Sequence, residues 1–197
     1  MDTAAVEAIS LLRPFIDEQY GAEVPDPEQR LQALREVAPG PLPDDYAATL
    51  FELRRTTGLV SPVIEAIEPA KPPAPGTYEW AGDTPPINVL YGLQEDRDNV
   101  IDEYLSMEFR MPTGLMPIGR DFGNGLICLD LSEQGHGQVV HWFGLGDPGP
   151  DVDGRPGRGN TFLLAHSFTD MCRRLRPEPE DDSGFDPSTA RICSIRR

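Results

Sequence analysis

The stretch that decides the fold is 115–143, LMPIGRDFGNGLICLDLSEQGHGQVVHWF. It contains three apolar runs, which are 115–121, 125–131 and 138–143. Gly123 and Asn124 lie between the first two runs, and both residue types tolerate the positive φ that a tight hairpin requires. Residues 132–137 supply a second, looser turn. The pattern predicts three consecutive strands in an antiparallel meander.

Helical patterns precede this meander. Apolar residues at helical spacing predict helices over 2–20, over 27–37 and from 42 to Gly58. Asp26 is a predicted N-cap for the second helix, because its carboxylate can accept a hydrogen bond from a backbone N–H of the first turn. Gly58 is a predicted C-cap for the third helix.

Weaker patterns predict the remaining elements. Residues 87–91 form a short strand, and 95–110 are irregular or weakly helical. The side of that segment expected to face the core is Val100, Ile101, Tyr104 and Leu105. The apolar run 162–165 is followed by Ser167, which is a predicted cap for a last helix.

Two long loops and a tail complete the chain. Residues 68–86 hold six prolines in 19 positions, which excludes a helix interior or a central strand. We interpret this segment as a surface loop rather than a domain boundary, because neither side has a self-sufficient pattern. Residues 144–160 are rich in glycine and proline, and the tail after Pro177 is expected to be poorly ordered unless it docks.

Composition limits the class of partner. The chain has 197 residues, with 33 acidic and 17 basic side chains and a net charge of −16. Such a charge repels phosphates, so nucleic acid is not expected as a direct ligand, whereas a basic protein is permitted. The N-terminus lacks a basic segment followed by an apolar one, and Cys128, Cys172 and Cys193 are odd in number and far apart. These features predict a cytoplasmic protein with no membrane span.

No motif predicts a catalytic, cofactor or metal site. The glycines from 144 to 149 match GxGxxG, but more glycine and proline follow instead of the helix that would hold a pyrophosphate. The acids of 147–153 fit neither register of a calcium loop. The histidines at 136, 141 and 166 show no metal-ligand spacing, and Cys128 lies in an apolar strand. A Cys-His-Asp set can be drawn from these letters, but their spacing does not support it.

The densest acidic segment is 95–108, and it is the candidate partner surface. Its predicted contact residues are Glu95, Asp96, Asp98, Asp102 and Glu103, with Tyr78 and Trp80 of the proline-rich loop as aromatic anchors. Uncompensated acids would steer a basic protein toward this surface. The alternatives remain open: the acids can form an ordinary solvated face, and the two aromatic side chains can fold back onto the core.

Several short motifs occur in a recognisable order. They are Leu42-Pro43-Asp44-Asp45-Tyr46, Pro117-Ile118, Gly123-Asn124-Gly125 before an apolar strand, Val139 to Trp142, and Ala165-His166-Ser167-Phe168. The set resembles the SUKH superfamily, the Smi/Knr-like domain, over about 28–176. The chain departs from the family pattern at 56–59, where many members have Asn-Gly-Gly, and its two long loops exceed the usual length.

The resemblance implies a fold, a domain division and a function. The implied fold is α+β, with a mostly antiparallel sheet of five to six strands packed by N-terminal helices and a C-terminal helix. Residues 1–25 would be a helical extension, 26–176 the domain and 177–197 a charged tail. The implied function is that of a non-enzymatic immunity protein that binds and occludes a cognate toxin, with a basic nuclease as the favoured partner. A regulatory adaptor without a toxin partner and a small hydrolase are the alternatives.

Overall fold

The computed structural model describes the greater part of the chain. The described residues are 3–17, 24–53, 57–59, 62–67, 85–95, 98–121, 125–143, 149–151 and 154–177. The expectations for Tyr78, Trp80 and Asp96, for the Gly123-Asn124 turn and for the tail after Pro177 lie outside these residues.

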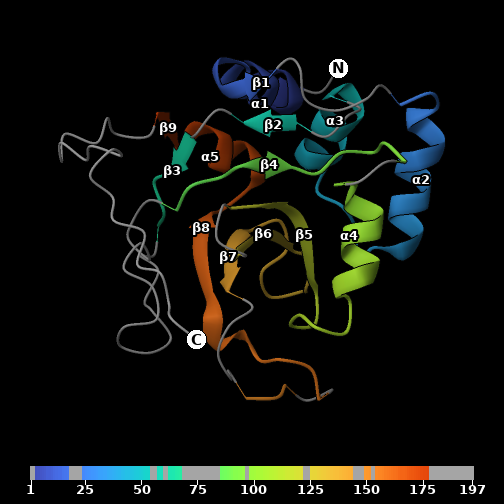
Figure 1. Ribbon diagram of the computed structural model, residues 1–197, viewed down its shortest axis with the longest axis vertical. Helices are drawn as coiled ribbons and strands as arrows, with labels where there is room; N and C mark the ends of the chain where they lie inside the picture. The colour runs from blue at the N-terminus through green and yellow to red at the C-terminus, as the bar shows by residue number, and fades with distance from the viewer. Residues whose placement is uncertain are drawn as a thin grey trace, which may run out of the picture.

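The backbone forms a seven-stranded antiparallel sheet and a two-stranded one (Figure 1). The large sheet has the order β1 (Ile16–Asp17), β2 (Thr57–Leu59), β4 (Val89–Leu90), β5 (Leu115–Arg120), β6 (Gly125–Asp130), β7 (Val139–Phe143) and β8 (Thr161–Ala165). The small sheet pairs β3 (Pro62–Ile64) with β9 (Leu175–Pro177). The α+β class with a mostly antiparallel sheet is therefore confirmed. The sheet is wider than expected because β1 and β2 have only two or three residues, too few for an alternating pattern to be recognised in the sequence. The predicted strand over 87–91 is present as β4.

The meander β5–β6–β7 is the centre of the sheet, as the sequence predicts. Ile127 of β6 pairs with His141 of β7, and Pro117 of β5 pairs with Cys128 of β6. The register of β5 shifts between Pro117 and Gly119. Proline has no N–H to give to a ladder, so an irregularity at this point is physically expected.

Two of the predicted helix caps are present. Asp26 accepts a hydrogen bond from the Gln29 backbone N–H at 3.0 Å and begins α2 (Pro27–Val37). Ser167 accepts one from the Asp170 N–H at 3.1 Å and begins α5 (Phe168–Arg173). Each cap gives a partner to an N–H that the first turn of a helix leaves without one.

Two sequence predictions for the N-terminal half are wrong. The expected helix over 2–20 stops early: α1 spans Thr3–Leu12, a 3-10 turn follows at Arg13–Phe15, and the chain then enters β1. Pro14 lies in that turn, and proline does not extend a helix because it has no N–H to donate. Gly58 is not a helix cap but a residue of β2 that pairs with Val89, and α3 spans Asp44–Leu53.

The predicted family motifs pack against each other at the start of two helices. The Asp45 carboxylate accepts hydrogen bonds from the backbone N–H and the hydroxyl of Thr169, both at 2.9 Å. The rings of Tyr46 and Phe168 meet edge to face with centroids 5.1 Å apart. These contacts join α3 to α5 across 124 residues of sequence. They give both motifs a structural role, because even a partly buried carboxylate loses hydration that hydrogen bonds must replace.

The sheet separates two apolar clusters of unequal size. The main core contains inward side chains of the sheet together with α1, α3, α5 and the buried sides of α2 and α4 (Val100–Met107). The smaller cluster lies on the other face and comprises Met111, Leu115, Leu126, Cys128, Val140 and Trp142. Alternate side chains of a strand point to opposite faces, which assigns neighbours such as Ile127 and Cys128 to different clusters. None of the helices in the described part of the chain has the length and apolarity needed to cross a membrane.

Candidate partner-binding surface

The acidic segment of the sequence forms the start of α4. Asn99 caps this helix: its side-chain oxygen accepts from the Asp102 N–H at 2.8 Å, and its amide donates to the Asp102 carboxylate at 2.7 Å. Asp102 and Glu103 lie in the first helical turn, where the helix dipole favours negative charge. The irregular or weakly helical segment expected from the sequence therefore contains a well-capped helix.

The structure separates the predicted acidic residues into two groups. Glu95 and Asp102 are exposed, and Glu103, next to Asp102 in the first turn of α4, is half-buried. Asp98 is different: it is 8% exposed, has a φ of 63°, and its carboxylate lies 2.6 Å from the Arg120 guanidinium. The ion pair between Asp98 and Arg120 holds the segment just before α4 against β5. Asp98 is thus a poor candidate for direct contact with a partner.

The acids on the surface of α4 are not neutralised by ion pairs. In the part of the chain that the structure describes, no ion pair joins Glu95, Asp102 or Glu103 to a basic side chain. Partial burial raises the pKa of Glu103, and the neighbouring Asp98 and Asp102 carboxylates raise it further against the lowering effect of Arg120. Ionising Glu103 therefore costs more than ionising an ordinary exposed glutamate, and a cation from a partner would relieve that cost.

Two apolar side chains on this surface were not predicted. Leu105 is 48% exposed and Phe109 is 73% exposed. The expectation that Leu105 faces the core is wrong, because α4 points Val100, Ile101 and Tyr104 inward. Asp102 and Leu105 are three residues apart on the outer side of α4, and this helical spacing is the sequence signal that could have placed Leu105 there once the helix start was known. Phe109 lies in the turn after α4.

The second long loop reaches the end of α4 through Arg155. Its guanidinium donates to the backbone carbonyl of Glu108 at 2.8 Å and lies 5.0 Å from the centroid of the Phe109 ring. The Asp151 carboxylate accepts from the Arg155 backbone N–H at 2.9 Å. A cation over an aromatic face is attracted by the ring, so this contact orients Phe109 while leaving it exposed.

Asp130 fixes the same loop to the sheet. Its carboxylate binds Arg158 through both oxygens, one of them at 3.1 Å, and accepts from the Ser132 N–H at 3.0 Å and hydroxyl at 2.6 Å. Burial would raise the pKa of Asp130, but the hydrogen bonds from Arg158 and Ser132 outweigh it and hold the pKa below its usual value. Arg158 also donates to the Thr113 carbonyl at 2.9 Å. The Asp130–Arg158 pair therefore connects the chain segments around Thr113, Ser132 and Arg158.

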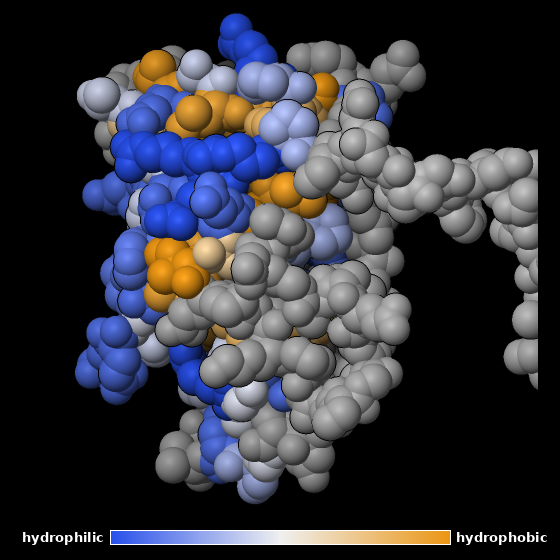
Figure 2. Space-filling view, turned by 90° about the vertical axis from the view of Figure 1, so that its left-hand side faces the viewer, coloured by the Kyte–Doolittle hydropathy of each residue, from blue (hydrophilic) through white to orange (hydrophobic). Residues whose placement is uncertain are grey.

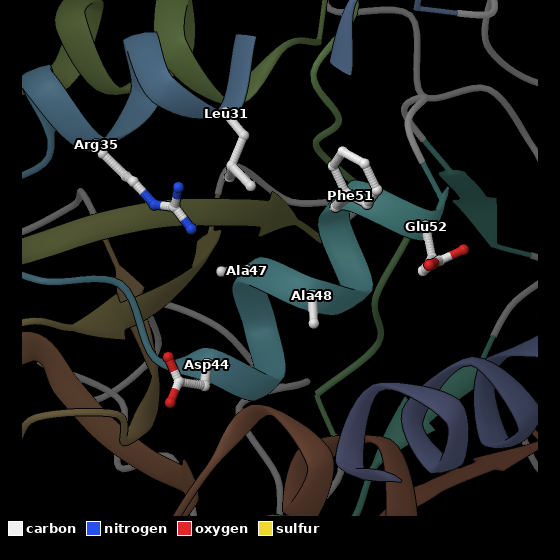
Figure 3. A pocket seen from close by; sticks show the side chains of 7 residues that line it. All are labelled: Leu31, Arg35, Asp44, Ala47, Ala48, Phe51 and Glu52. Atoms are coloured by element: carbon white, nitrogen blue, oxygen red, sulfur yellow. The ribbon is translucent and has the colours of Figure 1, made fainter. Parts of the chain in front are cut away.

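An open groove of about 400 Å³ lies between α2 and α3 (Figure 3). Its apolar lining is Leu31, Ala47, Ala48 and Phe51. Its charged rim is Arg35, Asp44 and Glu52. The two alanines on α3 leave the space that larger side chains would fill. The lining includes no cysteine, histidine or hydroxyl group, so it lacks a pair of groups that could act as nucleophile and base.

The strongest catalytic candidate among the described residues is a buried Asp–His pair. His141 Nε2 lies 2.8 Å from the Asp121 carboxylate, and both side chains are 0% exposed. Asp121 also accepts from the Gly125 N–H at 2.9 Å, which fixes the β5–β6 connection. Cys128 points to the opposite face of the sheet, and burial raises the pKa of its thiol. Among the described residues, no group of three or more metal-ligating side chains is arranged to hold a metal.

The charges on another face of the molecule are paired with one another. Figure 2 shows the side that carries β3, β8 and β9 in Figure 1, where hydrophilic bands lie next to smaller hydrophobic areas. Arg173 of α5 binds Glu7 of α1 at 2.7 Å, Arg174 binds Asp170 at 3.2 Å, and Arg176 binds Glu65 at 3.3 Å. We call the residues of these three ion pairs the paired face. Its charges link elements of the fold to each other.

The chain belongs to the SMI1 / KNR4 family (SUKH-1), whose model matches residues 27–174. The family resemblance drawn from the motifs is thereby confirmed. A relative in Bacillus subtilis (strain 168), the SPbeta prophage-derived uncharacterized protein YokK, is 29% identical over 112 residues. That match covers 52% of this chain and 52% of the relative, so the chain spans about half the length of the curated relative that it matches. No solved structure matches the chain.

Proposed function

We propose that this protein is a non-enzymatic binding module that neutralises a cognate toxin by covering the toxin's functional surface. Membership of the SMI1 / KNR4 family supports a protein-binding role of the immunity or SMI1/KNR4 type. The observation that carries the proposal is the start of α4, where Asp102 and Glu103 are neighbours without ion pairs inside the described chain, preceded by the exposed Glu95. Like charges held together weaken a fold, and a partner of opposite charge compensates for that cost.

The favoured partner is a basic protein, such as a nuclease whose own substrate site is positive. Complementary charge accelerates association, and an acidic surface can occupy a site that otherwise binds phosphates. The exposed Leu105 and Phe109 would add binding affinity to the attraction between charges. Apolar and aromatic side chains at the centre of an interface carry much of its affinity. The proposed place of action is the cytoplasm. Tyr78 and Trp80 remain proposed anchors of the same surface.

The proposal is tested by co-purification from the native host, followed by titration of the retained protein by isothermal calorimetry. The triple variant Glu95→Gln, Asp102→Asn, Glu103→Gln is expected to bind at least tenfold more weakly at low salt, through a slower on-rate. Asp98 stays unchanged in this variant, because its carboxylate supports the fold through Arg120. Unchanged affinity in a folded triple variant would remove α4 from the binding surface.

A regulatory adaptor is the second candidate, because the family itself is named after SMI1 and KNR4. The neighbouring gene separates the two functions: a toxin gene directly beside this one favours immunity. Growth assays then decide, because an immunity protein rescues cells that express the toxin and an adaptor does not.

A further inference from the structure

The α4 surface is too small to hold a partner alone. An eight-residue helix is ~12 Å long and ~10 Å wide, which gives a footprint of roughly 120 Å². A stable protein interface buries about 800 Å² on each side. A partner bound at α4 must therefore also contact neighbouring elements, and α2 is the helix that packs beside α4 (Figure 1).

Helix α2 lies between α4 and the groove. On one side, Arg30 donates to the carbonyls of Leu93 and Gln94, at 2.9 Å and 3.3 Å, just before α4. On the other side, Leu31 and Arg35 line the groove against α3. The outer side of α2 is exposed and polar, so a partner that covers it can reach both α4 and the groove.

The charge around the groove has the same sign as the charge on α4. The charged side chains that line the groove are the carboxylates of Asp44 and Glu52 and the guanidinium group of Arg35, which leaves a net negative charge. The two carboxylates can therefore attract cations, while the partly exposed Ala48 and Phe51 leave apolar surface between them (Figure 3).

We infer that the α2–α3 groove receives an apolar side chain from a basic segment of the same partner, with Asp44 and Glu52 binding the flanking cations. This inference rests on the proposed function, because it names a second contact point for the partner that α4 attracts. An apolar anchor inserted into a pocket and ringed by charged contacts is the usual arrangement of a binding hot spot. The groove supplies a recess into which such an anchor can insert.

The test uses two synthetic helical peptides with the same number of lysines and the ¹⁵N-labelled full chain. One peptide has leucines at i, i+4 spacing, and in the other these leucines are serines. We expect the leucine peptide to shift the amide signals of Leu31, Ala47, Ala48 and Phe51, and to bind about tenfold more tightly than the serine peptide, because burying one leucine is worth at least that factor. Serine-peptide binding as tight as leucine-peptide binding would overturn the inference.

Filling the groove is the decisive variant. Ala48→Trp places a large side chain in the space that Ala48 borders, and it is expected to lower the affinity for the leucine peptide to that for the serine peptide. Ser10→Trp, on the exposed side of α1, is the matched control and is expected to bind like the unmodified chain. If Ala48→Trp fails to fold, Ala48→Leu tests the same point with a smaller volume. Unaltered peptide binding by a folded groove variant contradicts the inference.

The location of the shifts distinguishes this inference from the proposed function. Shifts at Asp102 and Glu103 with no shift in the groove would overturn the groove contact and leave the α4 surface intact. Shifts in the groove alone would support the groove contact and remove α4 from the proposed surface. The absence of shifts in both places contradicts both.

Discussion

The α4 surface and the paired face use carboxylates in different ways. On the paired face, Glu7 and Asp170 are bound by Arg173 and Arg174 at the end of α5, so each negative charge has a partner supplied by the fold. On α4, Asp102 and Glu103 are brought together by the helix start, and no described arginine or lysine forms an ion pair with either. The difference teaches that negative charge alone does not mark a binding surface. We propose α4 as the binding surface because its first-turn carboxylates have no ion pair among the described residues and the exposed Leu105 lies on the same helix.

The largest expected effect comes from a substitution that loosens the loop contacting the end of α4. Asp130→Asn removes the charge that binds Arg158, and Arg158 holds the loop that carries Arg155. We expect a loss of about 2 kcal/mol in the free energy of unfolding, measured by urea denaturation, because a nearly buried carboxylate loses its ion pair while the half-exposed Arg158 regains some hydration. Arg173→Gln on the paired face is the control, and its effect is expected to be smaller. Equal effects would mean that the loop is held by other contacts.

The second effect compares two apolar side chains of almost equal exposure. Leu105 on α4 is 48% exposed and Val6 on α1 is 47% exposed. Leu105→Ser is expected to weaken binding of the co-purified partner about tenfold, because an anchor loses its buried area, whereas Val6→Ser leaves the affinity unchanged. Calorimetric titration measures both, and thermal unfolding confirms that both variants fold. Similar losses for the two would show that the partner does not select the α4 side.

The third effect separates local charge from net charge. The variants Glu95→Gln/Glu103→Gln and Glu7→Gln/Glu65→Gln change the net charge of the chain equally. We expect only the first pair to slow association, by several-fold at low salt, because steering depends on charge near the contact. Stopped-flow association rates at low and high salt provide the measurement. Equal slowing would assign the steering to the field of the whole molecule instead of α4.

The smallest effect is a difference in pH dependence. The hydrogen bond from Arg173 lowers the pKa of Glu7, so its stabilising contribution is present above the unfolded pKa and is lost as the pH falls through the folded pKa. Burial and neighbouring acids raise the pKa of Glu103, so its destabilising contribution is present above the folded pKa and is relieved as the pH falls. Glu103→Gln should thus slightly stabilise the chain near neutral pH, and Glu7→Gln should not.

Carboxyl carbon NMR titrations check the two directions independently of stability. Glu7 is expected to titrate below, and Glu103 above, the usual glutamate range. A Glu103 that titrates in the usual range would mean that its surroundings are more hydrated than its partial burial implies.

Local signals in the sequence were sufficient for the centre of the fold. The meander β5–β6–β7 has long apolar runs, and the caps Asp26 and Ser167 stand directly before their helices. The two errors at the N-terminal side, the helix over 2–20 and the Gly58 cap, concern the short strands β1 and β2. Those strands exist because they pair with each other and with β4, and such pairing is not visible in two or three residues.

For the candidate site too, some features could be predicted from the sequence and others depended on the tertiary structure. The sequence by itself determined the family, the antiparallel core and the segment with the most negative charge, because motif order, alternation and composition are local properties. Only the tertiary structure decided that Asp98 turns inward to Arg120, that Leu105 turns outward, and that Arg155 reaches Phe109 across 46 residues of chain. The physical reason is that burial and pairing depend on which segments meet in space, and a side chain's neighbours in the sequence do not specify them.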